Sequence, residues 1–216
     1  MTPSSSSSDA WAAIDECGVI AIIRGRFLDR IDEIVVQLID GGVRAIEISL
    51  TSPDALEQID RAVAAAGSRA TVGAGTVVQA QEVEEVFRRG AAFVVSPVVD
   101  EAVISASLDR SMLPVPGAFT PTEMTTAVRL GARAVKLFPA DSLGPLYVRA
   151  VLAPLPRLKL VPTGGVTLER AREFAVAGAW AIGVGTPLVS NPLDITALSA
   201  RAAQFVAAMR PASRPL

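Results

Sequence analysis

Lys136 lies in the middle of a short apolar run, residues 134–139 (AVKLFP). Since side chains alternate between the two faces of a β-strand, the lysine points away from the face that carries Val135 and Leu137. If that face packs against helices, the amine lies inside the fold. Burial disfavours the charged amine and lowers its pKa, which leaves free amine to attack a carbonyl carbon. The pattern therefore predicts Schiff-base chemistry at Lys136.

Glu47 lies between Ile46 and Ile48, so the same alternation predicts an interior carboxylate. Imine chemistry moves protons repeatedly, and the sequence contains no histidine, which is the usual general base. A partly buried carboxylate beside the lysine is then the best remaining proton carrier. The alternative is that Glu47 and Lys136 form an ion pair that only satisfies two buried charges.

Two further segments carry groups that could bind a ligand. Arg24 ends an apolar run at residues 21–25 (AIIRG), where its guanidinium could hold a small carboxylate through two parallel hydrogen bonds. The alternative is an arginine that extends over the surface at a strand end. Residues 73–76 (GAGT) follow another run; the glycines would let a ligand approach the backbone, and Thr76 offers a hydroxyl group.

Two glycine-rich stretches near the end of the chain predict a phosphate site. Residues 163–167 (TGGVT) and 183–186 (GVGT) lie at the ends of two successive apolar runs. Backbone N–H groups in such loops, and at the start of the following helix, bind phosphate in many barrel enzymes. The candidate residues are Thr163, Gly164, Gly165, Gly185 and Thr186. Ordinary tight turns would explain each loop taken singly.

Eight short apolar runs are candidate strands, at residues 19–23, 45–48, 70–72, 92–95, 113–115, 134–137, 158–161 and 180–184. Segments with helical spacing lie between them, as in Ile31, Ile34, Val35, Leu38 and Ile39. This alternation in so short a chain predicts an α/β protein with one closed (β/α)8 barrel, and an open doubly wound sheet is the alternative. In a barrel, the loops that follow the strands gather at one end and carry the chemistry.

Local signals mark where the helices begin and end. Glycines at positions 41, 42, 67, 90, 131 and 178 are typical of helix ends, because glycine readily adopts the left-handed conformation. Predicted starts are Ser52-Pro53, Thr167, and Thr120 with Glu123, which has the spacing of a capping box.

Composition bounds the possible partners and location. The 216 residues include 20 basic and 22 acidic side chains, so the excess positive charge typical of nucleic-acid binding is missing and small ligands are expected. Cys17 is the single cysteine, which fits core packing in a reducing, cytoplasmic location. Residues 1–10 are predicted to form a disordered serine-rich tail, 11–210 the barrel and 211–216 a second tail. No membrane helix is expected.

These motifs and their order resemble the aldolases that cleave 2-keto-3-deoxy-6-phosphogluconate (KDPG) and its galactonate epimer (KDPGal). The resemblance covers nearly the whole chain after the serine tail and is carried by residues 21–25, 46–48, 73–77, 96–97, 116–117, 136–139 and 164–166. It implies a homotrimeric class I aldolase without metal or cofactor that releases pyruvate and D-glyceraldehyde 3-phosphate. It also implies a Schiff base at Lys136, proton transfer by Glu47, and substrate contacts at Pro97 and Phe138.

The chain departs from the gluconate type at one position. Some gluconate-type members carry an arginine just after the glutamate strand, where this chain has Thr51 and Ser52. By resemblance to the galactonate type, Arg24 then holds the pyruvate carboxylate. Residues 143–147 (LGPLY) also resemble the galactonate type, whereas Thr163 resembles the gluconate type. A modest preference for the galactonate epimer is therefore expected.

Two other functions fit the same residues. A non-catalytic barrel that binds a phosphorylated metabolite would keep the glycine loops and leave Lys136 and Glu47 as an ion pair. A metal-free sugar-phosphate isomerase would also need the phosphate loops, but it would form no covalent lysine adduct. Trapping with pyruvate distinguishes both from an aldolase.

Overall fold

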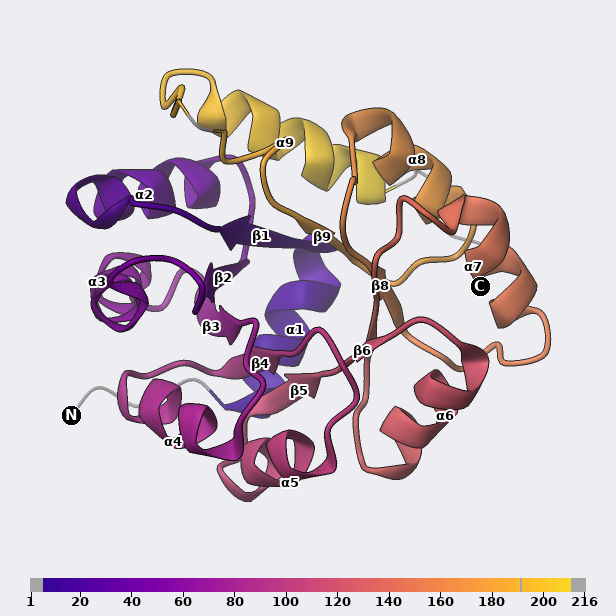
Figure 1. Cartoon of the computed structure of the whole chain (residues 1–216). Helices are drawn as coiled ribbons and strands as arrows, with labels where there is room; N and C mark the ends of the chain where they lie inside the picture. Colours follow the sequence, from indigo (N-terminus) through magenta and orange to yellow (C-terminus); the bar gives the residue numbers. More distant parts are fainter. Residues whose placement is uncertain (1–5, 191, 211–216) are drawn as a thin grey trace.

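Parallel strands form a closed ring that is surrounded by helices (Figure 1). The computed structural model describes residues 6–190 and 192–210. The strands are β1 (Val19–Ile23), β2 (Ala45–Ser49), β3 (Thr71–Gly75), β4 (Phe93–Val95), β5 (Leu113–Val115), β6 (Gly117–Ala118), β7 (Val135–Leu137), β8 (Leu160–Pro162) and β9 (Ile182–Val184). The helices are α1 (Ser7–Cys17), the short η1 (Leu28–Arg30), α2 (Ile31–Asp40), α3 (Ala55–Ala66), α4 (Ala80–Arg88), α5 (Glu101–Asp109), α6 (Pro121–Arg129), α7 (Gly144–Leu152), α8 (Leu168–Val176) and α9 (Leu198–Met209).

The ring consists of two parallel sheets that share one interrupted strand. One sheet has the order β5-β4-β3-β2-β1-β9 and the other has the order β6-β7-β8. β5 and β6 are consecutive segments separated by Pro116, which has no N–H group to donate to a ladder. An isolated parallel bridge between Thr163 and Gly183 joins the end of β8 to β9. This closure confirms the predicted (β/α)8 barrel and excludes the open sheet.

Two apolar layers hold the barrel together. The outer layer lies between the strands and the surrounding helices, and all five predicted apolar residues of α2 are buried in it. The inner layer fills the amino-terminal half of the barrel with side chains such as Ile20, Phe93, Leu113 and Val161. Ala10 of α1 packs on this inner layer and is fully buried, so α1 covers the amino-terminal end of the strands, behind the barrel in Figure 1. The carboxyl-terminal end is left for the functional side chains.

Most of the predicted helix boundaries are confirmed. The glycines at 42, 67, 90, 131 and 178 have positive φ just after a helix ends. The hydroxyl groups of Thr120 and Thr167 accept hydrogen bonds from the third residue of α6 and of α8. The predicted start at Ser52 is wrong, because α3 begins at Ala55. Instead, the Ser52 hydroxyl accepts a hydrogen bond of 3.0 Å from the backbone N–H of Gly25.

The predicted tail is wrong for residues 7–10, because α1 begins at Ser7. Ser6 and Asp9 form a reciprocal capping box that starts this helix within the serine run. Residues 1–5 and the second predicted tail, 211–216, lie outside the described residues. Cys17 is buried with a free thiol, as expected for core packing. Among the described helices, none is long and apolar enough to cross a membrane.

Candidate active site

Lys136 and Glu47 both lie inside the barrel, as predicted. Their strand neighbours Val135, Leu137, Ile46 and Ile48 pack in the outer layer, so alternation turns the two charged side chains inward. Both residues are almost fully buried: the exposed fraction of the surface is 5% for Lys136 and 2% for Glu47. The barrel therefore brings an amine and a carboxyl group from β7 and β2 into one interior space.

Glycines on neighbouring strands allow close packing around these side chains. Gly75 of β3 faces Glu47, and a Cβ atom at that position would overlap the Glu47 carboxylate. Lys136 pairs in register with Gly117 of β6, where a Cβ atom would collide with the backbone of Pro97. Gly75 is thus explained by the space that the interior carboxylate needs, and Gly73 by the Phe93 ring, which a Cβ atom there would overlap.

The pKa of each group is shifted in the direction that favours its neutral form. Burial raises the pKa of the Glu47 carboxyl group, and the positive charges of Lys136 and Arg24 offset this only in part. Burial also lowers the pKa of the Lys136 amine; Glu47 opposes that shift, and Arg24 adds to it. Free amine is the nucleophilic form of lysine, and a carboxyl group can donate a proton that its carboxylate form can take back.

Lys136 and Glu47 do not form an ion pair. Of the salt bridges within 4.0 Å in residues 6–190 and 192–210, none includes either side chain. The Lys136 Nζ atom instead lies 4.5 Å from the centre of the Phe138 ring. A pair kept only to satisfy two buried charges would be in direct contact. The absence of direct contact argues against the ion-pair alternative.

Arg24 follows β1 at the same end of the barrel and is exposed. In the described part of the chain its guanidinium has no carboxylate or hydrogen-bond partner. Its charge nevertheless affects the pKa of both Glu47 and Lys136, so it acts on the interior site. An unpaired guanidinium at the mouth of the barrel can bind a ligand carboxylate without first breaking another contact.

Hydroxyl groups form a cluster two residues beyond Glu47. The Ser49 hydroxyl lies 3.0 Å from the hydroxyl of Thr76 and 2.9 Å from that of Thr51. Thr76 has a φ of 62°, which is rare for a β-branched residue and marks a constrained position next to the site. Sequence reasoning missed Ser49, although a polar residue two positions after Glu47 on the same strand face is a usable signal.

The two glycine-rich loops meet as predicted, because the bridge between Thr163 and Gly183 holds them together. Gly164 and Gly165 have φ values of 96° and 66°, and the loop leads into the amino terminus of α8. The backbone N–H groups of Gly164, Gly165, Gly185 and Thr186 have no acceptor among the described residues. Free N–H groups beside a helix amino terminus favour an anion such as phosphate.

Phe138 connects the lysine to the first of these loops. Its ring atoms lie 3.4 Å from the position of a Cβ atom built on Gly164, and the same ring faces Lys136. The Thr163 hydroxyl donates a hydrogen bond of 3.1 Å to the Val161 carbonyl, which leaves its lone pairs available to a ligand. Pro97 lies at the start of the loop after β4, half-buried at the same end of the barrel.

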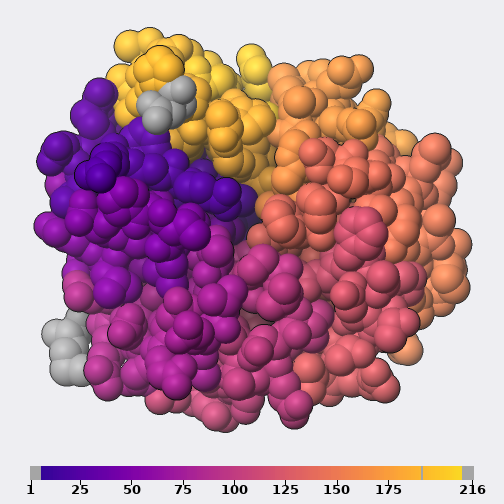
Figure 2. Space-filling view, in the orientation of Figure 1, coloured from indigo at the N-terminus to yellow at the C-terminus, as the bar shows by residue number. Residues whose placement is uncertain are grey.

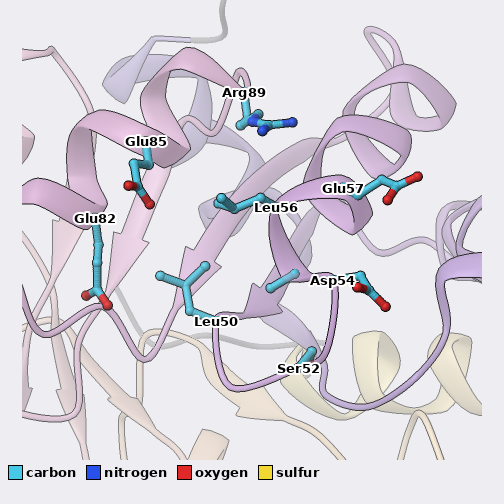
Figure 3. A pocket seen from close by; sticks show the side chains of 9 residues that line it. Leu50, Ser52, Asp54, Leu56, Glu57, Glu82, Glu85 and Arg89 are labelled. Atoms are coloured by element: carbon cyan, nitrogen blue, oxygen red, sulfur yellow. The ribbon is translucent and has the colours of Figure 1, made fainter.

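A hollow elsewhere on the molecule has the wrong charge for an acidic substrate. It lies between α3 and α4 and is lined by Asp54, Glu57, Glu82, Glu85 and Arg89 (Figure 3). Four carboxylates against one guanidinium would repel a phosphorylated keto acid.

At the barrel end seen in Figure 2, by contrast, the indigo atoms that follow β1 lie close to the orange and yellow segments that carry the glycine loops. Within residues 6–190 and 192–210, no cluster of metal-ligating side chains was found.

Comparisons with known proteins agree over nearly the whole chain. The family model "KDPG and KHG aldolase" matches residues 12–200. The chain is 36% identical to 2-dehydro-3-deoxy-6-phosphogalactonate aldolase of Escherichia coli (strain K12), over 90% of this chain and 95% of that protein. It is 37% identical to the probable enzyme of that name from Rhizobium meliloti (strain 1021), over 88% and 90%. A solved structure described as native KDPGal superposes with a TM-score of 0.84 at 36% identity, over 88% of this chain and 93% of the other.

Proposed function

Since the chain belongs to the KDPG and KHG aldolase family, we propose that it cleaves 2-keto-3-deoxy-6-phosphogalactonate to pyruvate and D-glyceraldehyde 3-phosphate through a Schiff base on Lys136. The observation that carries this proposal is a buried amine whose pKa is lowered, placed near Glu47 without an ion pair. The gluconate epimer is the second substrate. We also propose that the enzyme is a cytoplasmic homotrimer that needs no metal or cofactor.

The proposed reaction begins when the Lys136 amine adds to the keto carbon of the substrate and water leaves, which gives an imine. Glu47 then removes the proton of the C4 hydroxyl, and the C3–C4 bond breaks as its electron pair moves toward the imine nitrogen. Glyceraldehyde 3-phosphate departs. Glu47 returns a proton to C3 of the remaining enamine, and hydrolysis of the imine releases pyruvate and regenerates the amine.

Trapping with pyruvate and borohydride tests this chemistry. Reduction of the imine should leave a 1-carboxyethyl group on Lys136, detected by mass spectrometry of the peptides. The chain contains one other lysine, Lys159, which is exposed and serves as an internal control. Label on Lys136 and not on Lys159 supports the proposal. An unmodified Lys136 would refute it and favour the non-catalytic barrel or the isomerase.

The role of Arg24 gives a prediction about the carboxylate. Replacing Arg24 by alanine should weaken pyruvate binding by about tenfold or more, because the carboxylate loses a charge-assisted partner. Affinity for glyceraldehyde 3-phosphate should change little. The readout is the pyruvate concentration that gives half-maximal borohydride trapping. The Arg26→Ala variant, which removes an exposed neighbouring arginine, is the matched control. A larger effect on the aldehyde than on pyruvate would mean that the ligand lies in the opposite orientation.

Gly185 offers the cleanest test of the phosphate loop. A Cβ atom there would lie 3.9 Å from its nearest neighbour, Ile22, so alanine fits the free protein. At Gly165 the positive φ and the crowding by Asp141 would strain the fold instead. The Gly185→Ala methyl group should obstruct backbone contact and raise the KM of the phosphorylated substrate by about tenfold, while the KM of its unphosphorylated analogue changes little. Equal increases would remove the phosphate assignment.

The preferred epimer follows from the groups near C4. The Thr163 hydroxyl can accept a hydrogen bond from the C4 hydroxyl of either configuration, so it discriminates weakly. We expect kcat/KM to favour the galactonate compound by less than about tenfold. Measuring kcat/KM for both epimers decides the point. A gluconate preference beyond about tenfold, or about 1.4 kcal/mol, would reverse the choice of substrate and leave the mechanism unchanged.

A further inference from the structure

A groove lies at the end of the barrel opposite to the proposed active site. It is formed by Trp11 of α1, by the end of α6 and the turn after it, and by residues 154–159 before β8. These segments all precede strands, whereas the candidate catalytic groups lie within or follow them. The groove encloses about 770 Å³. Sites for small organic molecules enclose roughly 300–1,000 Å³, so the groove has the size of such a site.

One wall of the groove is apolar and preformed. Leu155 lies between Pro154 and Pro156, and the two prolines fix the backbone on either side of it. Val128 of α6 contributes an apolar side chain that is 44% exposed. A ligand that packs against this wall removes apolar surface from water without having to order the loop first.

Every charged side chain that lines the groove is a cation. These are Arg129, Arg133, Arg157 and Lys159. None of them has a carboxylate within 4.0 Å in the part of the chain that the structure describes. The sequence as a whole has more acidic than basic residues, and the hollow in Figure 3 is mainly acidic, so this local excess is a distinct feature.

Arg133 is held in a defined orientation by a stack of rings. Its guanidinium lies 3.9 Å from the centre of the Trp11 ring, and Trp11 stacks on Trp180 at 4.2 Å. The Trp180 indole N–H donates a hydrogen bond of 2.6 Å to Asp15. Arg133 itself donates no hydrogen bond to a described residue. A guanidinium that lies over an indole ring and donates no hydrogen bond within the protein has N–H groups available for an acid group.

We propose that this groove binds a small amphipathic organic anion. Its acid group pairs with Arg133 and is attracted by Arg157 and Lys159, and its apolar body packs against Leu155 and Val128. The apolar wall alone would accept a neutral molecule equally well, but four cations without carboxylate partners favour an anion. The site is separate from the proposed aldolase centre and does not depend on that activity.

The test uses the full chain and two fluorescent probes with nearly the same apolar body. One is the anion 8-anilinonaphthalene-1-sulfonate, and the other is the neutral N-phenyl-1-naphthylamine. Trp11 and Trp180 are the only tryptophans, so quenching of protein fluorescence reports on this end of the barrel. We expect saturable binding of one anilinonaphthalenesulfonate per chain with tryptophan quenching, unaffected by pyruvate, and affinity for the neutral probe that is lower by about tenfold or more.

Variants make the test specific. Arg133→Gln should weaken anilinonaphthalenesulfonate binding by about tenfold or more, and Arg157→Gln should weaken it to a smaller extent. Arg157 is exposed, so its variant serves if Arg133→Gln does not fold. Arg172→Gln removes the same charge from the exposed side of α8 and should bind like the parent protein. Unchanged affinity in both groove variants, equal affinity for the two probes, or displacement by pyruvate would overturn the proposal.

Discussion

The Lys136→Met variant is expected to lose at least about a thousandfold in kcat while the barrel remains folded. Methionine keeps an unbranched apolar stem of similar size in the interior, but it has no amine and cannot form an imine. The loss should therefore appear in the chemistry and not in the fold. The measurement is the rate of pyruvate release from saturating phosphorylated substrate, together with the circular dichroism spectrum of the variant.

Thermal unfolding separates a lost nucleophile from a damaged fold. Burial lowers the pKa of Lys136, so the folded state resists protonating an amine that the unfolded chain protonates freely. A lysine with a lowered pKa in the folded state reduces the free energy of unfolding at neutral pH. This reduction disappears only when the pH rises above the pKa of the lysine in the unfolded chain. Lys136→Met should then melt at the same temperature as the parent or higher. Lys159→Met, at the exposed second lysine, should retain full activity. Persistent cleavage by Lys136→Met would refute the Schiff base.

The Glu47→Gln variant is expected to reduce kcat by roughly a hundredfold or more, with a much smaller change in KM. Glutamine has nearly the shape of glutamate and fits the space that Gly75 leaves, but it cannot exchange a proton with the substrate. Imine formation, bond cleavage and enamine protonation each need such an exchange. Steady-state kinetics on the phosphorylated substrate give kcat and KM separately.

The matched control for Glu47 is Glu57→Gln, at an exposed carboxylate of the hollow between α3 and α4. It makes the same chemical change and should leave kcat unaltered. If Glu47→Gln kept the parental rate, proton transfer would have to be assigned to another group, and the Ser49 hydroxyl cluster would be the next candidate. If KM alone rose, Glu47 would be a binding residue.

The interior position of both ionisable groups could be predicted from the sequence, because strand alternation acts over two or three residues. Val135 and Leu137 fix the face of Lys136, and the isoleucines around Glu47 do the same for that residue. All eight predicted runs overlap a strand for the same reason. That the glycine loops meet also followed from the barrel topology, since consecutive parallel strands lie side by side.

Features that depend on distant partners could not be predicted in this way. α1 begins in a serine run of low hydrophobicity, and its burial depends on contacts such as Trp11 with Trp180, which are far apart in the chain. Ser52 resembles a helix cap, but its hydroxyl binds Gly25 on the preceding loop. β6 was missed because Pro116 interrupts the strand. The groove cations come from segments that meet only in the folded barrel.

The division of the barrel into two sheets has a consequence for its motions. Lys136 belongs to the three-stranded sheet and Glu47 to the six-stranded one. The two sheets are joined by the chain at Pro116 on one side. On the other side they are joined by the bridge between Thr163 and Gly183 and by a hydrogen bond of 3.0 Å from the Trp180 backbone N–H to the Leu160 carbonyl. β8 and β9 do not belong to one continuous sheet, so we expect the ring to open more readily between them than within either sheet. Such an opening would change the distance between Lys136 and Glu47, whereas Lys136 and Thr163, which directly follows β8, would move together.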